Sequence, residues 1–241
     1  MTGLELADFP TAILAGGLAT RLGSLTENIP KSLVQVSGEP FLAHQLALLR
    51  NQGIKRVVLC VGHLGEMIKA EFGDGASFGI GLEYSFDGPR LIGTGGAVDK
   101  ALPLLGDQFF VMYGDSYLPI EFRPVASAFC QSGKAALMTV FRNENRWDTS
   151  NIQFENGRIL EFSKGRPTAA MHHIDYGLSV FSARAFAGTP EAFDLLELMV
   201  RLLAEEELGA HEVDRRFYEV GSPGGLVELD KFLKQQKAAA R

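Results

Sequence analysis

Residues 11–33 read TAILAGGLATRLGSLTENIPKSL, and this stretch decides the fold class. The apolar run at 11–14 is typical of a buried strand, and two glycines follow almost directly. Glycine lets a backbone approach a phosphate closely and expose its N–H groups. Arg21 and Lys31 come next, and two cations at that spacing can neutralise a triphosphate or a pyrophosphate leaving group. We therefore predict a phosphate-binding loop, with a tight turn that holds no ligand as the alternative.

The first half of the chain alternates apolar strand patterns with helical patterns. The predicted strands lie at 11–15, 55–62, 81–86 and 108–115, and the predicted helices at 40–53, 64–73 and 94–105. This alternation predicts parallel βαβ units with right-handed crossovers. Ligands of such sheets bind at the carboxyl ends of the strands, so we expect the glycines after residue 14 and Asp115 at one edge.

The pattern changes after about residue 135. Strand patterns occupy 134–142, 150–164 and 171–182, with an Asn-Gly hairpin turn at 155–157, and helical patterns occupy 191–207 and 223–240. We expect this half to add antiparallel strands and to cover one end of the sheet. The predicted fold is α/β and Rossmann-like, with a mixed, mainly parallel central sheet flanked by helices.

Composition excludes several classes of function. The 241 residues are 46% hydrophobic with a formal net charge of −6, and an acidic chain without a basic stripe is a poor candidate for binding nucleic acid or anionic membrane. The first ten residues lack the basic and apolar regions of a signal peptide, and no apolar run approaches the ~18 residues of a membrane span. We expect a cytoplasmic protein whose Cys60 and Cys130 are reduced thiols in the core.

Asp115 is a candidate metal ligand. Aspartate commonly caps turns, and that role is the alternative. Its place after an apolar strand, at the same sheet edge as the glycine loop, favours metal ligation instead.

The segment LAGGLATRLGSLTENIPKSLVQVSGEPFL at 14–42 resembles the signature of the sugar-1-phosphate nucleotidyltransferases, usually L-A-G-G-x-G-T-R-L, then P-K-P, then G-x-P. The similarity extends over nearly the whole chain. Further stretches that resemble family motifs are LIGTGGAV (91–98), YGDS (113–116), IDYGLSVF (174–181) and FYEVGSPGGL (217–226). The nearest resemblance is to the heptose 1-phosphate and mannose-1-phosphate guanylyltransferases.

This resemblance implies that the partners are an NTP and a sugar 1-phosphate, joined with release of pyrophosphate, and its nearest members imply guanylyl transfer to a heptose or mannose 1-phosphate. Arg21 would hold the β and γ phosphates, Lys31 would lie near the α-phosphate, and Asp115 would hold Mg²⁺. The nucleophile is an ionised phosphate oxygen, so catalysis should rest on positioning and on screening of charge. The residues implied in nucleotide binding are Leu14, Ala15, Gly16, Gly17, Ser85, Gly93 and Thr94.

The resemblance also implies an acceptor side. Its sugar-phosphate residues would be Asn151, Lys164, Asp175, Tyr176 and Gly177, and Glu219 would be a second metal ligand. The chain would then form one domain over 1–241, with an NTP-binding half at about 1–134 and a sugar-phosphate-binding half at about 135–241.

Four positions depart from the family pattern. Ala19 replaces a glycine, Ser32 a proline, Asp175 an asparagine and Glu219 an aspartate. Alternatives therefore remain open: uridylyl, thymidylyl or cytidylyl transfer to another phosphorylated acceptor, or an inactive nucleotide-binding regulatory subunit. An oxidoreductase is disfavoured because the loop lacks the dinucleotide-binding spacing. The sequence leaves a homo-oligomer open.

Overall fold

The computed structural model describes residues 4–17 and 29–239. The strands are β1 Thr11–Leu14, β2 Gln35–Val36, β3 Glu39–Pro40, β4 Arg56–Val61, β5 Gly81–Phe86, β6 Gln108–Tyr113, β7 Ser116–Tyr117, β8 Ala136–Arg142, β9 Ile152–Glu155, β10 Arg158–Phe162, β11 His173–Ser182, β12 Leu208–Val213 and β13 Tyr218–Glu219. The α-helices are α1 Phe41–Gln52, α2 Gly65–Phe72, α3 Gly93–Leu105, α4 Phe122–Ser132, α5 Leu195–Ala204 and α6 Pro223–Ala239. The predicted strands and helices of the first half are confirmed, each within about two residues.

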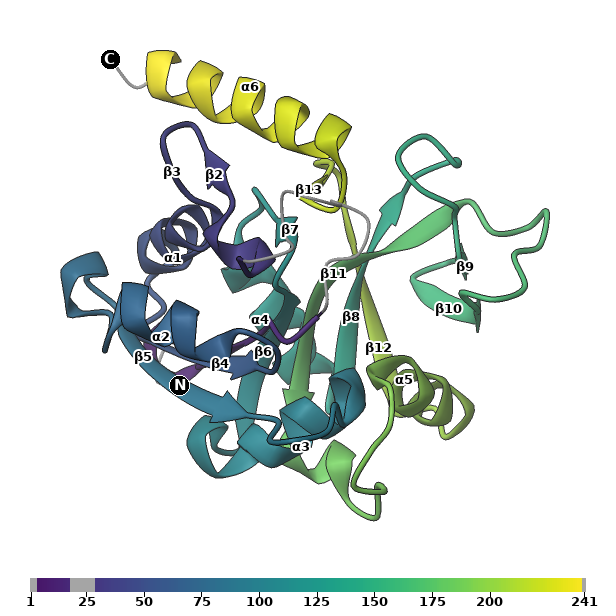
Figure 1. The fold of residues 1–241 in the computed structure, drawn as a ribbon. Coiled ribbons are helices and arrows are strands. Elements are labelled where there is room, and N and C mark those ends of the chain that lie inside the picture. Colours follow the sequence, from purple (N-terminus) through teal and green to yellow (C-terminus); the bar gives the residue numbers. More distant parts are fainter. Residues whose placement is uncertain (1–3, 18–28, 240–241) are drawn as a thin grey trace.

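A nine-stranded sheet runs through the described part of the chain (Figure 1). Strands β6, β1, β4 and β5 are neighbours in that order and pair in parallel. Strand β11 pairs antiparallel with both β6 and β8, and β12 pairs in parallel with β8. The sheet is therefore mixed and mainly parallel, as predicted, and the carboxyl ends of β1, β4, β5 and β6 share one edge.

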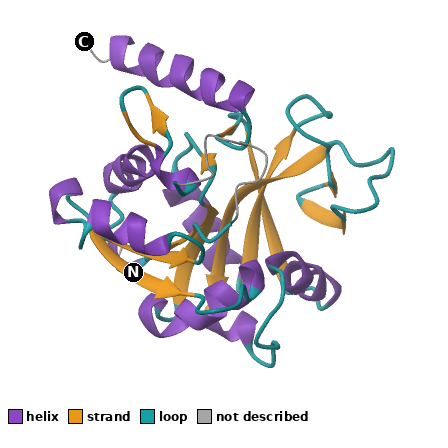
Figure 2. Ribbon diagram, viewed as in Figure 1, coloured by secondary structure: helices purple, strands orange, loops and turns teal. Residues whose placement is uncertain are grey.

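Helices cover both faces of the sheet, as Figure 2 shows. On β4, Val57, Leu59 and Val61 pack in one core cluster with α1, α2 and α4. The alternate residues Val58 and Cys60 pack in a second cluster with α3 and α5. Side chains of a strand point alternately to opposite faces, so a strand covered on both sides is apolar throughout.

Turn chemistry fixes two element ends. Gly53 adopts φ +92° and ends α1, as the sequence predicts. Asn156 and Gly157 have φ of 50° and 78° and join β9 to the antiparallel β10, which confirms the predicted hairpin.

The segment after β11 differs from the prediction. Helix α5 begins at Leu195 and not at 191, because the Phe193 carbonyl accepts the N–H groups of Gly95 and Gly96. A helix starting earlier would lose these tertiary bonds. Residues 208–213 form the parallel strand β12, which the sequence did not indicate. Its Gly, Ala and His residues give no clear apolar alternation.

Helix α6 packs at the rim of the molecule, beside the β2–β3 hairpin (Figure 1). Its Leu229 and Leu233 are buried with Phe41 and Val220. Asp230 accepts hydrogen bonds from both the N–H and the hydroxyl of Ser37, at 3.0 and 2.9 Å. Among the described helices, none is long and apolar enough to cross a membrane.

The two cysteines have different environments, which corrects the prediction that both lie in the core. Cys60 is 1% exposed, whereas Cys130 is exposed on α4, and neither forms a disulfide. Burial, reinforced by the nearby Asp87 carboxyl, raises the pKa of the Cys60 thiol to about 12. The strand face beneath Cys60 is apolar, but Cys130 lies on the outer side of its helix.

We expect a disulfide reagent such as dithionitrobenzoate at pH 8 to titrate one thiol in the native protein and two in denaturant. With a pKa of about 12, only about 10⁻⁴ of Cys60 is thiolate at pH 8, and the thiolate is the reactive form. Cys130→Ser serves as the control and should leave no fast thiol. Rapid titration of two thiols in the native protein would contradict this prediction.

Candidate active site

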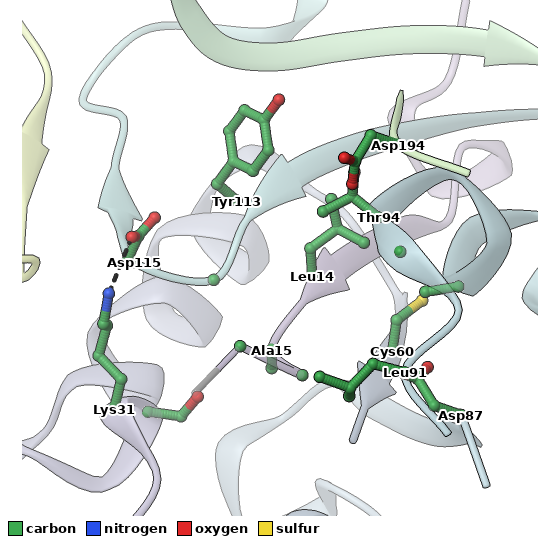
Figure 3. Close-up of a pocket in the computed structure, with 16 residues that line it drawn as sticks. Leu14, Ala15, Lys31, Cys60, Asp87, Leu91, Thr94, Tyr113, Asp115 and Asp194 are labelled. Atoms are coloured by element: carbon green, nitrogen blue, oxygen red, sulfur yellow. Dashed lines mark hydrogen bonds and ion pairs between the residues drawn. The ribbon is translucent and has the colours of Figure 1, made fainter. Parts of the chain in front are cut away.

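A pocket of about 330 Å³ opens at the carboxyl ends of β1, β4 and β6 (Figure 3). Residues from four separate segments that the sequence marks as candidate site residues line this pocket. The predicted residues that line it are Leu14, Ala15, Gly16, Gly17, Lys31, Gly93, Thr94 and Asp115. The structure thus brings together residues that are up to a hundred positions apart in sequence.

One end of the pocket carries a charged pair. The Lys31 ammonium lies 3.0 Å from Asp115 Oδ2, and both side chains are only partly exposed. Lys31 begins the short 3-10 helix Lys31–Leu33, and Asp115 follows β6 by two residues. A cation and a carboxylate in contact at the mouth of a sheet can bind, respectively, a phosphate oxygen and a metal ion.

Gly114 explains how β6 comes so close to β1. Its N–H donates to the Leu14 carbonyl at 3.0 Å. A Cβ at Gly114 would lie 2.4 Å from that carbonyl oxygen. The oxygen belongs to the backbone of β1, so it cannot move away unless the two strands separate. Glycine at this position therefore holds Asp115 against the end of β1.

The opposite end of the pocket is formed by Asp87 and the apolar Cys60, Leu91 and Ala97. Figure 3 labels Asp87, Cys60 and Leu91. Asp87 follows β5, and its N–H donates to the Val61 carbonyl at 2.9 Å. Burial raises the pKa of the Asp87 carboxyl, and the charge of Lys100 acts in the opposite direction. Sequence reasoning missed Asp87, although its place directly after β5 puts it on the ligand-binding edge.

The 93–96 segment begins α3 and lines the pocket through Gly93 and Thr94. Glycine is also required here because the backbone of Phe193 packs closely against this segment. A Cβ on Gly93 would lie 2.4 Å from the Phe193 carbonyl oxygen. The Thr94 hydroxyl accepts the N–H of Leu195 at 2.8 Å, next to Asp194, which lines the pocket. This contact joins the second half of the chain to the start of α3 at the pocket wall.

Ser85 lies elsewhere. It is on β5, opposite Cys60 in the ladder, is 8% exposed and does not line this pocket. Asp87, two residues later, lines the pocket instead.

Lys164 and Asp175, two residues predicted for the acceptor side, form a second group beside the pocket together with Tyr113 of β6. Lys164 Nζ lies 3.6 Å from Asp175 Oδ2 and 3.4 Å from the Tyr113 hydroxyl, which is itself 3.4 Å from Asp175 Oδ2. Burial and the carboxylates of Asp175 and Asp115 hold the pKa of Tyr113 well above its usual value. Tyr113 therefore stays a neutral hydroxyl, and because it also lines the pocket it connects the two groups.

The backbone around Asp175 is fixed by two predicted residues. Its N–H donates to Asn151 Oδ1 at 3.0 Å, and its Oδ1 accepts the Gly177 N–H at 3.0 Å. Gly177 has φ +96°, where the register of β11 against β8 shifts. Asn151 and Gly177 thus orient Asp175. Position 177 favours glycine because a residue with a Cβ rarely adopts this positive φ.

Tyr176 is placed differently from its neighbours. It is 1% exposed, and its ring contacts Phe141 and Phe217 in the core. Adjacent residues of a strand point to opposite faces, so Asp175 and Tyr176 cannot both face one substrate. The structure therefore puts Tyr176 beneath this group and not on its surface.

Backbone pairing between two distant segments brings Glu219 close to Asp115. Strands β7 and β13 pair Glu219 with Ser116, and the Val220 N–H donates to the Asp115 carbonyl at 2.9 Å. Among residues 4–17 and 29–239, no three His, Cys, Asp or Glu side chains gather as a metal cluster. Two carboxylates completed by phosphate oxygens nevertheless suit Mg²⁺, which favours one or two carboxylates together with substrate phosphates. Arg21 and Ala19 lie outside the described residues.

Comparison with known proteins places this site in context. The family model for nucleotidyl transferases matches residues 11–187. A D-glycero-alpha-D-manno-heptose 1-phosphate guanylyltransferase of Campylobacter jejuni is 39% identical over 153 residues, which cover 63% of this chain and 66% of that protein. A UTP–glucose-1-phosphate uridylyltransferase of Synechocystis is 27% identical over 201 residues, covering 76% and 50%.

The fold is also found among solved structures. HddC from Yersinia pseudotuberculosis, complexed with GMP-PN, superposes with a TM-score of 0.76 at 23% identity, over 93% of this chain and 99% of that one. The chain spans about half to two thirds of the length of the curated relatives it matches first. The family model covers most of the chain, from β1 to the residues after β11. The chain therefore belongs to the nucleotidyl transferase family.

Proposed function

We propose that this chain joins an NTP and a sugar 1-phosphate into an NDP-sugar with release of pyrophosphate, and that the NTP is GTP. The observation that carries the reaction class is the Lys31–Asp115 pair at one end of the pocket, beside the Tyr113–Lys164–Asp175 group. In a single domain, residues 1–134 would bind the NTP and residues 135–241 the sugar 1-phosphate. Asp194, from the second half, also lines the pocket.

In this reaction a phosphate oxygen of the sugar 1-phosphate attacks the α-phosphorus of the NTP. The bond from that phosphorus to the bridging oxygen breaks, and pyrophosphate leaves with the electron pair. The attacking oxygen is already ionised, so no general base is needed. Lys31 offsets charge near the α-phosphate, and Lys164 offsets charge on the acceptor phosphate while Asp175 holds that ammonium in place.

Asp115 and Glu219 are the residues that would hold Mg²⁺. When bound there, the ion would screen the repulsion between the two anionic substrates. The Lys31–Asp115 contact is compatible with this role, because the same carboxylate that pairs with an ammonium can also ligate a cation.

The choice of GTP follows from Asp87 at the apolar end of the pocket. Guanine presents two adjacent donors, N1–H and the N2 amino group, and one carboxylate can accept both, as it does from an arginine. Uracil and thymine present a single N–H between two carbonyl oxygens, which a carboxylate repels. The guanylyltransferase relative and the GMP-PN complex agree with this choice.

The test is pyrophosphate release from GTP, CTP, UTP, dTTP and ATP, each with mannose, glucose, N-acetylglucosamine and heptose 1-phosphates and Mg²⁺. We expect the highest kcat/KM with GTP. Turnover confined to UTP or dTTP would overturn the guanine assignment and leave the reaction class standing. Nucleotide binding without pyrophosphate release from any pair would overturn the proposed reaction in favour of a regulatory binding protein.

A further inference from the structure

A stack of side chains connects the acceptor side of the site to the strand that carries Glu219. The guanidinium of Arg216 lies 3.4 Å from the ring centroid of Trp147 and 4.4 Å from that of Tyr218. Tyr218 stacks in turn on Phe232 of α6, with ring centroids 4.4 Å apart. Arg216 also pairs with Glu228 of α6 at 2.7 Å. A planar cation between two aromatic faces is a favourable and directional arrangement.

Trp147 belongs to a loop at 143–151 that is rigid through its own hydrogen bonds. The Asn143 amide donates to the Asp148 carbonyl at 2.6 Å and to the Ser150 hydroxyl at 3.2 Å. The loop ends at Asn151, whose Oδ1 accepts the Asp175 N–H. A displacement of Trp147 would therefore be transmitted to Asp175 and the Lys164 ammonium that it holds.

The other side of the stack leads to the metal-binding carboxylates. Tyr218 is the residue before Glu219 on β13, and that strand is held against Asp115 by the β7–β13 ladder. Arg216 thus touches the loop that orients Asp175 on one side and the strand that carries Glu219 on the other. It lines neither the nucleotide pocket nor the Tyr113–Lys164–Asp175 group.

We propose that Arg216 is a positioning residue, whose guanidinium between Trp147 and Tyr218 fixes the 143–151 loop against the strand that carries Glu219. This inference rests on the proposed function. Transfer between two anions requires them to be held in line, and a misplacement of about 1 Å can cost about 100-fold in rate. Arg216 acts through Trp147 and Tyr218 and touches no substrate.

The experiment is a double-mutant cycle on kcat/KM for the sugar 1-phosphate, with GTP and Mg²⁺ saturating. We expect R216A and W147A each to lower it by about 10-fold to 100-fold, and the double variant to lower it no further. The KM for GTP should stay within about twofold of the wild type. We expect the loss to include a higher KM for the sugar 1-phosphate, whereas a merely structural role would reduce the active fraction and leave that KM unchanged.

Trp147 is the only tryptophan of the chain, so its emission reports on the stack without any assay of activity. We expect a longer-wavelength maximum in R216A and R216K, since the ring loses the guanidinium face and gains water. R215A is the matched control: Arg215 is exposed, and the variant should change neither emission nor kinetics. If R216A melts below the assay temperature, R216K replaces it in the cycle, because lysine retains the charge for Glu228 but not the planar stack.

Kinetics of R216A within twofold of the wild type, or additive losses in the double variant, would overturn the inference. Unchanged Trp147 emission in R216A would also overturn it, because the stack would then be absent in solution. A wild-type chain that releases no pyrophosphate would defeat the proposed function itself. An active wild type with unaffected variants would defeat only the positioning role.

Discussion

Asp115→Asn will lower kcat/KM by about 1000-fold or more, which corresponds to about 4 kcal/mol of transition-state stabilisation. Asparagine preserves the size of the side chain but removes the charge that pairs with Lys31 at 3.0 Å and that would hold Mg²⁺. The carboxylate would act through the Mg²⁺ that it holds, and loss of a metal ion that screens a transferring phosphoryl group typically costs several kcal/mol. Initial rates of pyrophosphate release measure the effect, with one substrate varied through its KM and the other substrate and Mg²⁺ saturating.

The matched control is Asp107→Asn. Asp107 precedes β6, Asp115 follows it, and Asp107 is exposed, so the same change at the other end of one strand should leave activity within about twofold. Thermal melting should show all three proteins folded, because the Lys31–Asp115 pair is partly exposed and contributes little to stability. Activity of Asp115→Asn within tenfold of the wild type would remove Asp115 from the metal site.

Asp87→Asn will reduce the preference for GTP over UTP by about 100-fold or more. A hydrogen bond to a charged group contributes about 1.5–3 kcal/mol, and guanine would lose one such bond and meet an amide donor in its place. The asparagine side chain offers one acceptor and one donor, which match the N3–H and the carbonyl of uracil. We therefore expect kcat/KM to fall with GTP and to rise with UTP.

Comparing two nucleotides within one variant provides the internal control. Misfolding or a displaced loop would lower both rates by the same factor, whereas only a base-reading residue changes their ratio. Asp87→Glu is a second variant, with the carboxylate retained and one methylene added; it should keep the GTP preference at a lower rate. An unchanged GTP-to-UTP ratio in Asp87→Asn would contradict the assignment of Asp87 to the base.

Local patterns in the sequence were sufficient for several elements of this protein. The apolar run at 11–14, the glycine that ends α1 and the Asn-Gly turn at 156–157 each specify a structure through their own neighbours. The alternation of strands and helices then implies the parallel sheet, and the sheet implies that the glycines after residue 14 and Asp115 share an edge.

Tertiary structure decided what depends on contacts between distant segments. Residues 208–213 became a strand because β8 offered an unpaired edge, and α5 began late because Phe193 bonds to the start of α3. The side of β11 on which Tyr176 lies follows from its packing against Phe141 and Phe217. The position of Asp87 opposite the Lys31–Asp115 pair follows from the strand order β6-β1-β4-β5.

The physical reason for this division is the range of the forces concerned. Backbone preferences and hydrophobic periodicity act within a few residues, so they can be recognised in the sequence itself. The meeting of Trp147, Arg216 and Tyr218 brings together two segments nearly seventy residues apart, and no local pattern marks it. The sequence by itself determined the parallel strands of the first half and the edge at which their carboxyl ends meet, and only the folded chain determined which side chains gather there.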